Sequence, residues 1–269
     1  MGAPTGRRSA GRSASFPSLF SPTGRAPVPA GLRVRLDPDA AEERALQSLG
    51  HRSVAGIDEV GRGCLAGPVV AGAVILPLGW IPPGLRDSKL LDAATRERLA
   101  TEIRARAVAW AVAEVSAPLI DRINILQATL LASVLAAARL AVRPDALITD
   151  SLDLPGVAVV QRVLTDADRV CASVAAASVV AKVHRDRLMA VFDQRYPGYR
   201  FAVHKGYAAP EHRAAIEALG LSPIHRRTFG SCVGRPDLDQ TRLWAEAEPA
   251  ATPAGDGAAD GPATRVSGG

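Results

Sequence analysis

The sequence predicts an α/β domain in which helices flank a mixed β-sheet. Short runs rich in Val, Ile and Ala alternate with longer helical patterns through the middle of the chain. The first two runs, residues 54–60 and 68–76, are separated only by the Gly-rich stretch GRGCLAG, which favours two strands joined by a short connection. Strands that begin with such a pair and then mix with helices are typical of a mixed sheet.

Both ends of the chain differ from this middle part. The chain has 269 residues, of which 48% are hydrophobic, so it can bury a sizeable core. Residues 1–35 and 235–269 are instead rich in Gly, Pro, Ala and Ser, with too few large apolar groups to offset the entropy of ordering. We therefore expect two disordered tails around one folded domain, residues 36–234.

Three further elements follow the first two strands. Residues 77–84 are expected to form a loop because they are rich in Pro and Gly. Asp92 is an N-cap candidate for a surface helix over 93–107, where apolar residues recur at helical spacing among charges. Residues 108–115 alternate between large and small side chains, which favours a third strand.

The next segments combine a helix with two strands. Residues 124–140 are rich in Ala and Leu without interruption, so we expect a mostly buried helix. Residues 146–150 are a short apolar run that ends in an acid and precedes the turn 151–156, which is typical of a strand. Residues 157–163 are a further strand candidate.

Two helices complete the domain. An Ala-rich pattern predicts a long helix over residues 171–194, which the stretch YPGY ends because Pro cannot continue it. The last predicted helix begins at Pro210 and ends at Leu219, just before Gly220. Pro at the start and Gly after the end are typical of helices.

The cysteine and charge content narrows the class of protein. The cysteines at 64, 171 and 232 lie far apart and form no CxxC pair, which argues against a disulfide framework and a structural zinc site and fits a reducing cytoplasm. We find no signal-peptide pattern and no uncharged window of membrane-spanning length, so we expect no membrane association. The net charge of +5 favours an anionic partner such as nucleic acid.

Four acidic residues are candidates for a metal site. Asp58 and Glu59 lie within the first predicted strand, where an unpaired carboxylate is costly. Neighbouring strand residues point to opposite faces, so a bend is needed for both to reach one ion, and a simple ion pair with Arg62 is the alternative. Asp150 and Asp168 lie at element ends, where functional groups often occur. Four carboxylates without histidine or cysteine would form an all-oxygen site that suits Mg²⁺ or Mn²⁺.

Six sequence blocks then point to a known family. In chain order they are GIDEVGRGCLAGPVVAGAV, DSKLL, NILQAT, ASVAAASVVAKVHRDRLM, HKGY and SPIHRRTF. Together they span nearly all of residues 54–229 and resemble bacterial ribonuclease HII. The resemblance implies a ribonuclease H-like fold with a helical C-terminal extension. It also implies an endoribonuclease that cleaves the RNA strand of RNA–DNA hybrids and incises 5′ of single ribonucleotides in duplex DNA, leaving 5′-phosphate and 3′-hydroxyl ends.

The resemblance assigns four catalytic and metal-binding residues: Asp58, Glu59, Asp150 and Asp168. It implies Mn²⁺ or Mg²⁺ as the cofactor, with two ions during catalysis. The sequence departs from the family pattern at two of these acids. Ser151 stands where the family usually has Gly after the third acid, and TDADR stands where the fourth acid usually follows Lys-Gly. Asp166 is therefore a rival to Asp168, although counting back from AASVVAK favours Asp168.

The resemblance also implies which residues bind nucleic acid. Gly61, Arg62 and Gly63 would approach the ribose through backbone groups, and only the 2′-OH distinguishes ribose from deoxyribose. Tyr207 in HKGY would stack on the deoxyribose that follows, and a half-buried packing role is its alternative.

Basic residues are candidates for phosphate contacts, namely Lys89, Lys182, Arg226 and Arg227. Lys182 can instead pair with Asp186 on the same helix, and the two arginines can form a solvated face. Ser178 is expected to pack within the Ala-rich helix. We expect the protein to act as a monomer.

Two other functions stay open. A metal-independent ribonuclease could use histidine as general acid and base, and it would form a cyclic phosphate and act in chelator. The five histidines lack metal-ligand spacing such as HExxH, so packing or surface positions are expected for them: His51, His184, His204, His212 and His225. A non-catalytic hybrid-binding protein would bind nucleic acid without cleaving it in Mn²⁺, and the intact set of acids argues against it.

Overall fold

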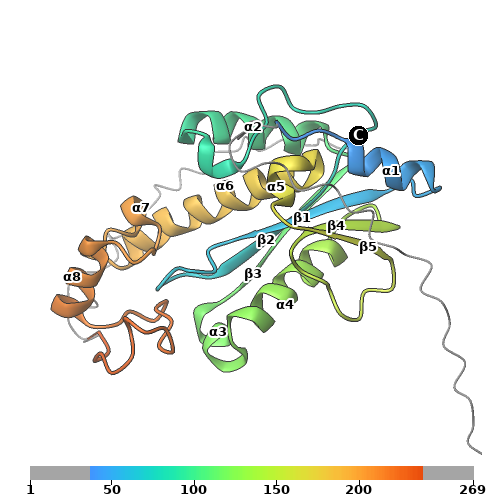
Figure 1. Ribbon diagram of the computed structural model, residues 1–269. Helices are drawn as coiled ribbons and strands as arrows, with labels where there is room; N and C mark the ends of the chain where they lie inside the picture. The colour runs from blue at the N-terminus through green and yellow to red at the C-terminus, as the bar shows by residue number, and fades with distance from the viewer. Residues whose placement is uncertain (1–36, 239–269) are drawn as a thin grey trace, which may run out of the picture. The chain divides into compact units, whose positions relative to one another are not determined.

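Helices cover both faces of a five-stranded sheet in the computed structural model, which describes residues 37–238 (Figure 1). The predicted tail 1–35 lies outside the described residues, as do residues 239–269 of the second predicted tail. The described elements, in chain order, are α1 (Ala41–Ser48), β1 (Val54–Val60), β2 (Val69–Ile75), the 3₁₀ turn η1 (Ser88–Leu90), α2 (Ala93–Arg106), β3 (Ala109–Val115), α3 (Ala117–Ile123), α4 (Ile125–Ala138), β4 (Ala146–Asp150), β5 (Val160–Leu164), α5 (Ala167–Val170), α6 (Ala172–Arg195), α7 (Phe201–His204) and α8 (Pro210–Leu219).

The sheet is mixed, as the sequence predicted. Its strand order is β3-β2-β1-β4-β5, with antiparallel pairs from β3 to β1 and parallel pairs from β1 to β5. The predicted strands 54–60, 68–76, 108–115 and 146–150 form within one residue of their expected ends. The candidate strand 157–163 begins later, at Val160, because its partner β4 begins at Ala146, directly opposite.

The helix α6 lies directly on β1 and β2 because two glycines leave room for its backbone. A Cβ at Gly56 would lie 2.2 Å from backbone atoms of α6, and a Cβ at Gly72 would lie 2.4 Å from another of them. Gly72 is the register partner of Asp58. The side chains that α6 buries are mostly small, so the helix backbone approaches the strand that carries the first two candidate acids. Helix α2 packs on α6 (Figure 1).

The helices α3 and α4 cover the opposite face of the sheet (Figure 1). The predicted buried helix 124–140 forms as α4, but only a face of small residues such as Ala128 and Ala132 is buried, whereas Leu126 is 46% exposed. The sequence analysis missed α3, although Pro118 in its first turn is a helix-start signal. Asn124 separates the two helices, and its side chain accepts a hydrogen bond of 3.0 Å from the Gln127 amide.

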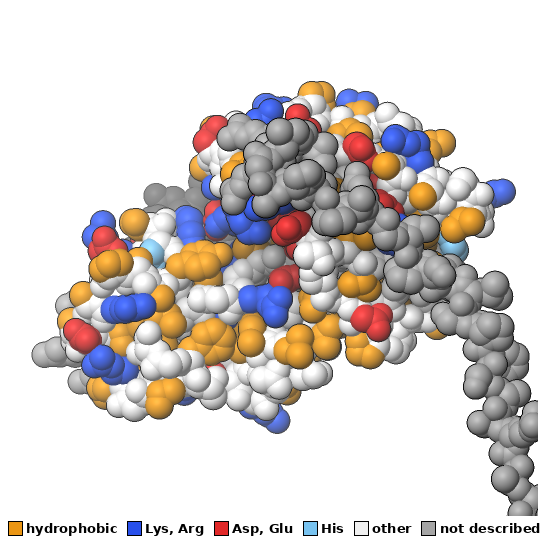
Figure 2. Space-filling view, viewed as in Figure 1, with side chains coloured by type: hydrophobic (Ala, Val, Ile, Leu, Met, Phe, Trp, Pro, Cys, Tyr) orange, Lys and Arg blue, Asp and Glu red, His pale blue; other side chains and the backbone are white. Residues whose placement is uncertain are grey.

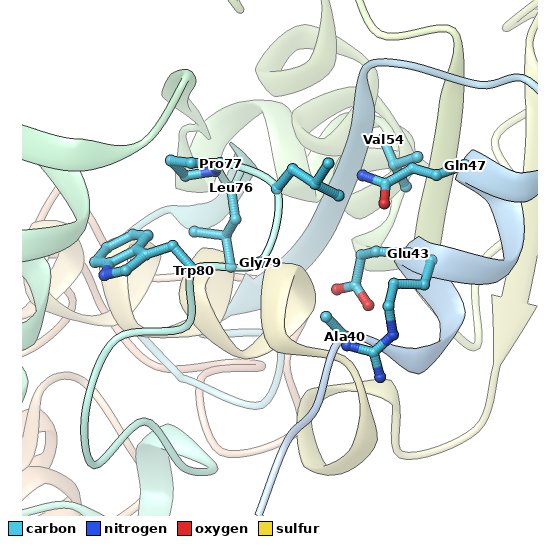
Figure 3. A pocket seen from close by; sticks show the side chains of 10 residues that line it. Ala40, Glu43, Gln47, Val54, Leu76, Pro77, Gly79 and Trp80 are labelled. Atoms are coloured by element: carbon cyan, nitrogen blue, oxygen red, sulfur yellow. The ribbon is translucent and has the colours of Figure 1, made fainter.

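Helix α1 was also missed by the sequence analysis. Its Glu43 is buried and accepts hydrogen bonds from the backbone amide of Ser173, at 2.8 Å, and from its hydroxyl, at 2.7 Å. A carboxylate at this position satisfies the free amide of Ser173 at the start of α6. Figure 3 shows Glu43 and Gln47 facing the segment that carries Pro77, Gly79 and Trp80, around a small pocket. The contact with α6 anchors α1 to the folded domain.

The C-terminal elements pack beside the connection between β1 and β2. Helix α8 has the predicted bounds, and α6 and α8 are joined through α7 (Figure 1). The amides of Leu65 and Ala66 donate to the carbonyl oxygen of Gly206 at 2.8 and 3.3 Å. Residues 236–238 hydrogen-bond with Leu221. The HKGY turn, residues 204–207, therefore lies against the GRGCLAG connection, residues 61–67.

No single helix within residues 37–238 is long and apolar enough to cross a membrane, and only the pair α3 and α4, bent by 119°, passes such a test together. The three cysteines, Cys64, Cys171 and Cys232, are free and buried.

Candidate active site

Asp58 lies near the end of β1 on the face covered by α6. Only 7% of the residue is exposed. Burial raises its pKa well above the usual value, the negative charges of Glu59 and Asp168 raise it further, and a hydrogen bond with Ser178 lowers it. Ser178 also lies 2.9 Å from the hydroxyl of Ser88. The expectation that Ser178 packs within α6 is confirmed, and its hydroxyl also contacts a candidate acid.

Glu59 points away from α6, as alternation along a strand requires. Its side chain is 13% exposed and its Oε1 lies 3.2 Å from Nη1 of Arg62. Burial raises the pKa of Glu59, Arg62 lowers it, and the charge of Asp150 raises it. The ion pair that the sequence offered as an alternative is therefore present, and Glu59 also lies within the electrostatic reach of a second candidate acid.

Asp150 ends β4, next to the end of β1. The last paired residues of these strands are Ile57 and Thr149, so Asp58 and Asp150 are the next residues on adjacent parallel strands. Oδ1 of Asp150 accepts a hydrogen bond of 3.3 Å from the amide of Ala167, which starts α5. This bond brings the start of α5, and with it Asp168, to the same sheet end.

Asp168 and its rival Asp166 differ sharply in position. Asp168 is 3% exposed, and its Oδ2 lies 3.3 Å from Nζ of Lys89. Burial raises the pKa of Asp168, Lys89 lowers it, and the charges of Asp87 and Asp150 raise it. The Asp166 side chain is 67% exposed and lies 4.0 Å from Arg169. The structure therefore brings Asp168, and not Asp166, to the other candidate acids.

The four candidate acids are thus linked electrostatically: Glu59 and Asp168 raise the pKa of Asp58, and Asp150 raises the pKa of Glu59 and of Asp168. Figure 2 shows acidic side chains with basic ones beside them at the middle of the visible face, over the region of β1 and α5. Within residues 37–238, no three His, Cys, Asp or Glu side chains are arranged to hold a metal ion. Glu59 and Asp168 contact Arg62 and Lys89 instead, so a shared ion would have to replace these basic partners.

The loop after β1 is held by two fully buried arginines. Arg226 donates to the carbonyl oxygens of Gly61 at 2.6 Å, Arg62 at 2.7 Å and Gly67 at 3.0 Å. Arg185 donates in the same way to three carbonyl oxygens of the loop and of the HKGY turn. Burial lowers the pKa of Arg226 to about 10, which leaves it protonated at neutral pH.

These contacts correct the sequence analysis for Arg226. Both suggestions made for it, a phosphate contact and a solvated face, are wrong because the side chain is fully buried and its nitrogens are bonded to backbone. Arg227 is about half exposed and pairs with Asp237. The buried position of Arg226 was not visible in the sequence because a charged residue is seldom buried without an acidic partner.

The two glycines of GRG differ in what surrounds them. Gly61 has φ +90°, and a Cβ there would lie 2.2 Å from Nε of Arg185, so only glycine fits. A Cβ at Gly63 would meet no atom within 4 Å. Because the carbonyls of Gly61 and Arg62 point to Arg226, the amides of the same two peptides, on Arg62 and Gly63, point the opposite way, toward the exposed side.

Tyr207 lies at the edge of this loop. It is 42% exposed, and its ring centroid lies 5.9 Å from Cζ of Arg185. Burial raises the pKa of Tyr207, and the neighbouring Cys64 raises it too. Lys182 is tied to Asp186 by a bond of 2.6 Å, which is the alternative that the sequence offered for it. The structure therefore brings Tyr207 to the GRG loop and Lys89 to the acids, while Lys182 has an acidic partner of its own.

A family model described as ribonuclease HII matches residues 55–232 of the chain. The chain belongs to the ribonuclease HII family. Ribonuclease HII from Solibacter usitatus (strain Ellin6076) is 51% identical over 203 residues, which cover 76% of this chain and 88% of that protein. Ribonuclease HII from Geobacter sulfurreducens is 54% identical over 188 residues, which cover 70% of this chain and 86% of that protein.

The ribonuclease HII fold is supported by a solved structure as well. Ribonuclease H2 from Pyrococcus horikoshii OT3 matches with a TM-score of 0.58 and 27% identity, covering 67% of this chain and 95% of that chain. This likeness confirms the ribonuclease H-like fold expected from the sequence. As a ribonuclease HII, the protein is an endoribonuclease of the ribonuclease H type.

Sequence reasoning missed Asp87 in this ribonuclease HII. Asp87 is 3% exposed, accepts a hydrogen bond of 2.9 Å from the Lys89 amide and lies 3.4 Å from Nε of Arg169. It thereby fixes the turn that carries Lys89 and adds negative charge beside Asp168. An Asp that follows a Pro- and Gly-rich loop and precedes Ser is an N-cap signal, and this signal could have found it.

Proposed function

We propose that this protein hydrolyses the RNA strand of RNA–DNA hybrids and incises 5′ of single ribonucleotides in duplex DNA, leaving 5′-phosphate and 3′-hydroxyl ends. One observation carries the proposal: four coupled acids lie at the ends of β1, β4 and α5, and the loop that directly follows β1 turns backbone amides outward. A site of this kind can bind divalent cations and a ribose phosphate side by side.

The donor set fits Mn²⁺ or Mg²⁺, as the family resemblance also implies. Asp58, Glu59, Asp150 and Asp168 offer only oxygen, and burial together with mutual repulsion raises the pKa of three of them. A cation among these carboxylates would relieve their repulsion. The four residues would therefore hold the metal ions, and two ions would be bound during catalysis. Bound divalent ions supply an activated water and charge stabilisation for the leaving 3′-oxygen.

The basic residues at the site would change partners on binding. Arg62 and Lys89 now neutralise Glu59 and Asp168, and a cation would take over this role. The Lys89 side chain is 76% exposed, so it is free to turn to a backbone phosphate. The positive charges of Arg62 and Lys89, released from the acids, would then lie along the nucleic acid strand. Lys182 stays a proposed phosphate contact, although its bond with Asp186 would have to open.

Recognition of the ribonucleotide is assigned to the GRG loop and Tyr207. The outward amides of Arg62 and Gly63 can donate to the ribose 2′-OH, which deoxyribose lacks. Open space at the Cβ position of Gly63 lets a sugar approach the backbone closely. Tyr207, partly exposed beside the loop, offers its ring to the neighbouring deoxyribose.

The decisive experiment is cleavage of a DNA duplex bearing one ribonucleotide, in Mn²⁺, in Mg²⁺ and in chelator. The parent should cut 5′ of the ribonucleotide with either metal, and Asp58→Asn should lose at least about a hundredfold in rate. An all-DNA duplex is the substrate control. Equal rates for the parent and Asp58→Asn would contradict the site assignment.

The same experiment separates the alternatives. Cleavage in chelator with a cyclic phosphate product would indicate a histidine-based ribonuclease. Tight binding of the hybrid without cleavage in Mn²⁺ would indicate a binding protein.

We further propose that the enzyme acts as a monomer in the cytoplasm. Its three free thiols suit a reducing compartment. Elution at the monomer mass in size-exclusion chromatography is the expected result.

A further inference from the structure

A cluster of three histidines, His204, His212 and His225, lies at the HKGY turn. His212 and His225 are buried, and the ring of His212 stacks on that of His204 with centroids 4.3 Å apart. Phe201 packs edge-on against His212, with centroids 5.5 Å apart. The cluster belongs to α7, α8 and the SPIHRRTF segment, not to the elements that carry the four acids. The expectation that these histidines are packing residues is confirmed for His212 and His225.

The hydrogen bonds fix which nitrogen of each ring carries the proton. The amide of Ser222 donates to Nδ1 of His225 at 2.8 Å, so this nitrogen has no proton in a neutral ring. The proton of His225 is then on Nε2, which lies 3.0 Å from Nε2 of His212. Because His212 must accept there, its own proton is on Nδ1, 2.8 Å from the carbonyl oxygen of Tyr207.

The result is one directed chain, from the Ser222 amide through His225 and His212 to the carbonyl of Tyr207. Every nitrogen in it has one role, and the chain exists only while both rings are neutral. A further proton on His212 would place two N–H groups face to face across 3.0 Å, and a further proton on His225 would face the Ser222 amide across 2.8 Å. Burial lowers the pKa of His212 to about 4 and that of His225 to about 3, in agreement with neutral rings.

This chain of hydrogen bonds ends at Tyr207, the residue that we propose contacts the substrate. The same carbonyl of Tyr207 also accepts a hydrogen bond of 2.8 Å from the amide of Ala209. The preceding residue, Gly206, accepts a hydrogen bond from the amide of Leu65 in the GRGCLAG connection. Two donors from α8 and its start therefore fix the Tyr207 peptide, while a third bond ties the turn to the loop. A fixed peptide limits the positions that the exposed ring can reach.

We propose that His212 and His225 are positioning residues, a neutral pair whose hydrogen bond to the Tyr207 carbonyl holds the Tyr207 ring in place for the nucleic acid. The inference rests on the proposed function, because it takes Tyr207 as a substrate contact. Within residues 37–238, the charged side chains that act on the cluster include Glu211, Asp193 and Arg200, which act on His204, and Arg227, which acts on His225.

The test is a double-substitution cycle on cleavage of the duplex with one ribonucleotide. His212→Phe keeps the ring but removes the donor, and kcat/KM should fall about tenfold, mainly through KM. In a Tyr207→Ala background the same substitution should have no further effect, because its target is already gone. His212→Asn places an amide donor near Nδ1 and should recover activity to within about threefold of the parent. His51→Phe is the matched control and should stay within about twofold.

The possible results separate the two proposals. If Tyr207→Ala cleaves like the parent, the substrate role of Tyr207 is wrong and the positioning role is wrong with it. If Tyr207→Ala is impaired but His212→Phe is equally harmful in both backgrounds, only the positioning role is wrong. A folded His212→Phe variant with the parental KM would likewise show that the positioning role is wrong.

A second measurement needs no substitution, in case the variants do not fold. Nitrogen-15 NMR of the parent enzyme distinguishes the two histidine tautomers. We expect the proton on Nε2 of His225 and on Nδ1 of His212, both unchanged between pH 7 and pH 5.5. The opposite tautomers, or a charged ring in this range, would overturn the proposal.

Discussion

Arg226 donates from Nη2 to the carbonyl oxygen of Gly61 over 2.6 Å, and this bond joins residues 165 positions apart in the chain. With its bonds to Arg62 and Gly67, it fixes the loop that follows the two central acids. The C-terminal part of the domain thus shapes the loop by which we propose the enzyme reads its substrate.

Removal of this guanidinium should therefore be costly. Arg226→Met leaves three carbonyl oxygens without their donor, and we expect the free energy of unfolding to fall by about 3 kcal/mol or more. Arg227→Met, at the adjacent and half-exposed position, is the control and should change it by less than about 0.5 kcal/mol. Urea unfolding checks both. A similar effect of the two substitutions would show that burial of Arg226 does not stabilise the fold.

The two glycines of the GRG loop should respond differently to the same substitution. In Gly61→Ala, the alanine would have to adopt φ +90° and its Cβ would clash with Arg185. We therefore expect the free energy of unfolding to fall by about 2 kcal/mol or more. Gly63→Ala has free space and should change stability by less than about 1 kcal/mol. It should nevertheless lower kcat/KM for a single ribonucleotide about tenfold, since its methyl group would hinder a sugar that approaches the backbone. Thermal unfolding and cleavage assays on both variants decide this, and parental activity of Gly63→Ala would refute close approach.

The rivalry between Asp166 and Asp168 can be settled by a matched pair of variants. Asp168→Asn removes a buried charge that acts on Asp58, and we expect metal-dependent cleavage to fall at least about tenfold. Asp166→Asn changes an exposed side chain and should keep the parental rate to within about twofold. The rate as a function of Mn²⁺ concentration is the measurement. A larger loss for Asp166→Asn would reverse the assignment.

Stability should decline in mild acid because of the buried histidines. Their pKa is lowered in the folded state, from 6.5 to about 4 for His212 and about 3 for His225, so the unfolded chain takes up protons first. The contribution of the two neutral rings to the free energy of unfolding is fully present above pH 6.5. It is lost as the pH falls toward the folded-state pKa values. At pH 5 the loss is about 2 kcal/mol for each ring. Urea unfolding at pH 7 and pH 5 should show a smaller difference for His212→Phe than for the parent, and an equal difference would contradict the explanation.

Much of the fold could be predicted because it depends on local patterns. The strands β1 to β4 and the helices α6 and α8 were found from alternation, Ala content and the Pro and Gly residues at their ends. The short helices α1, α3, α5 and α7 were missed. A segment of eight residues or fewer gives no clear period, and its helix depends on tertiary contacts such as that of Glu43 with Ser173.

For the site, the sequence by itself determined which acids are available and that Asp150 and Asp168 lie at element ends, because strand and helix ends follow from patterns along the chain. Only the tertiary structure decided that Asp168 rather than Asp166 lies near Asp58, that Arg226 is buried, and that His212 reaches the carbonyl of Tyr207. The physical reason is that burial and hydrogen bonding of a charged or polar side chain depend on which distant segments surround it, and no local pattern encodes that.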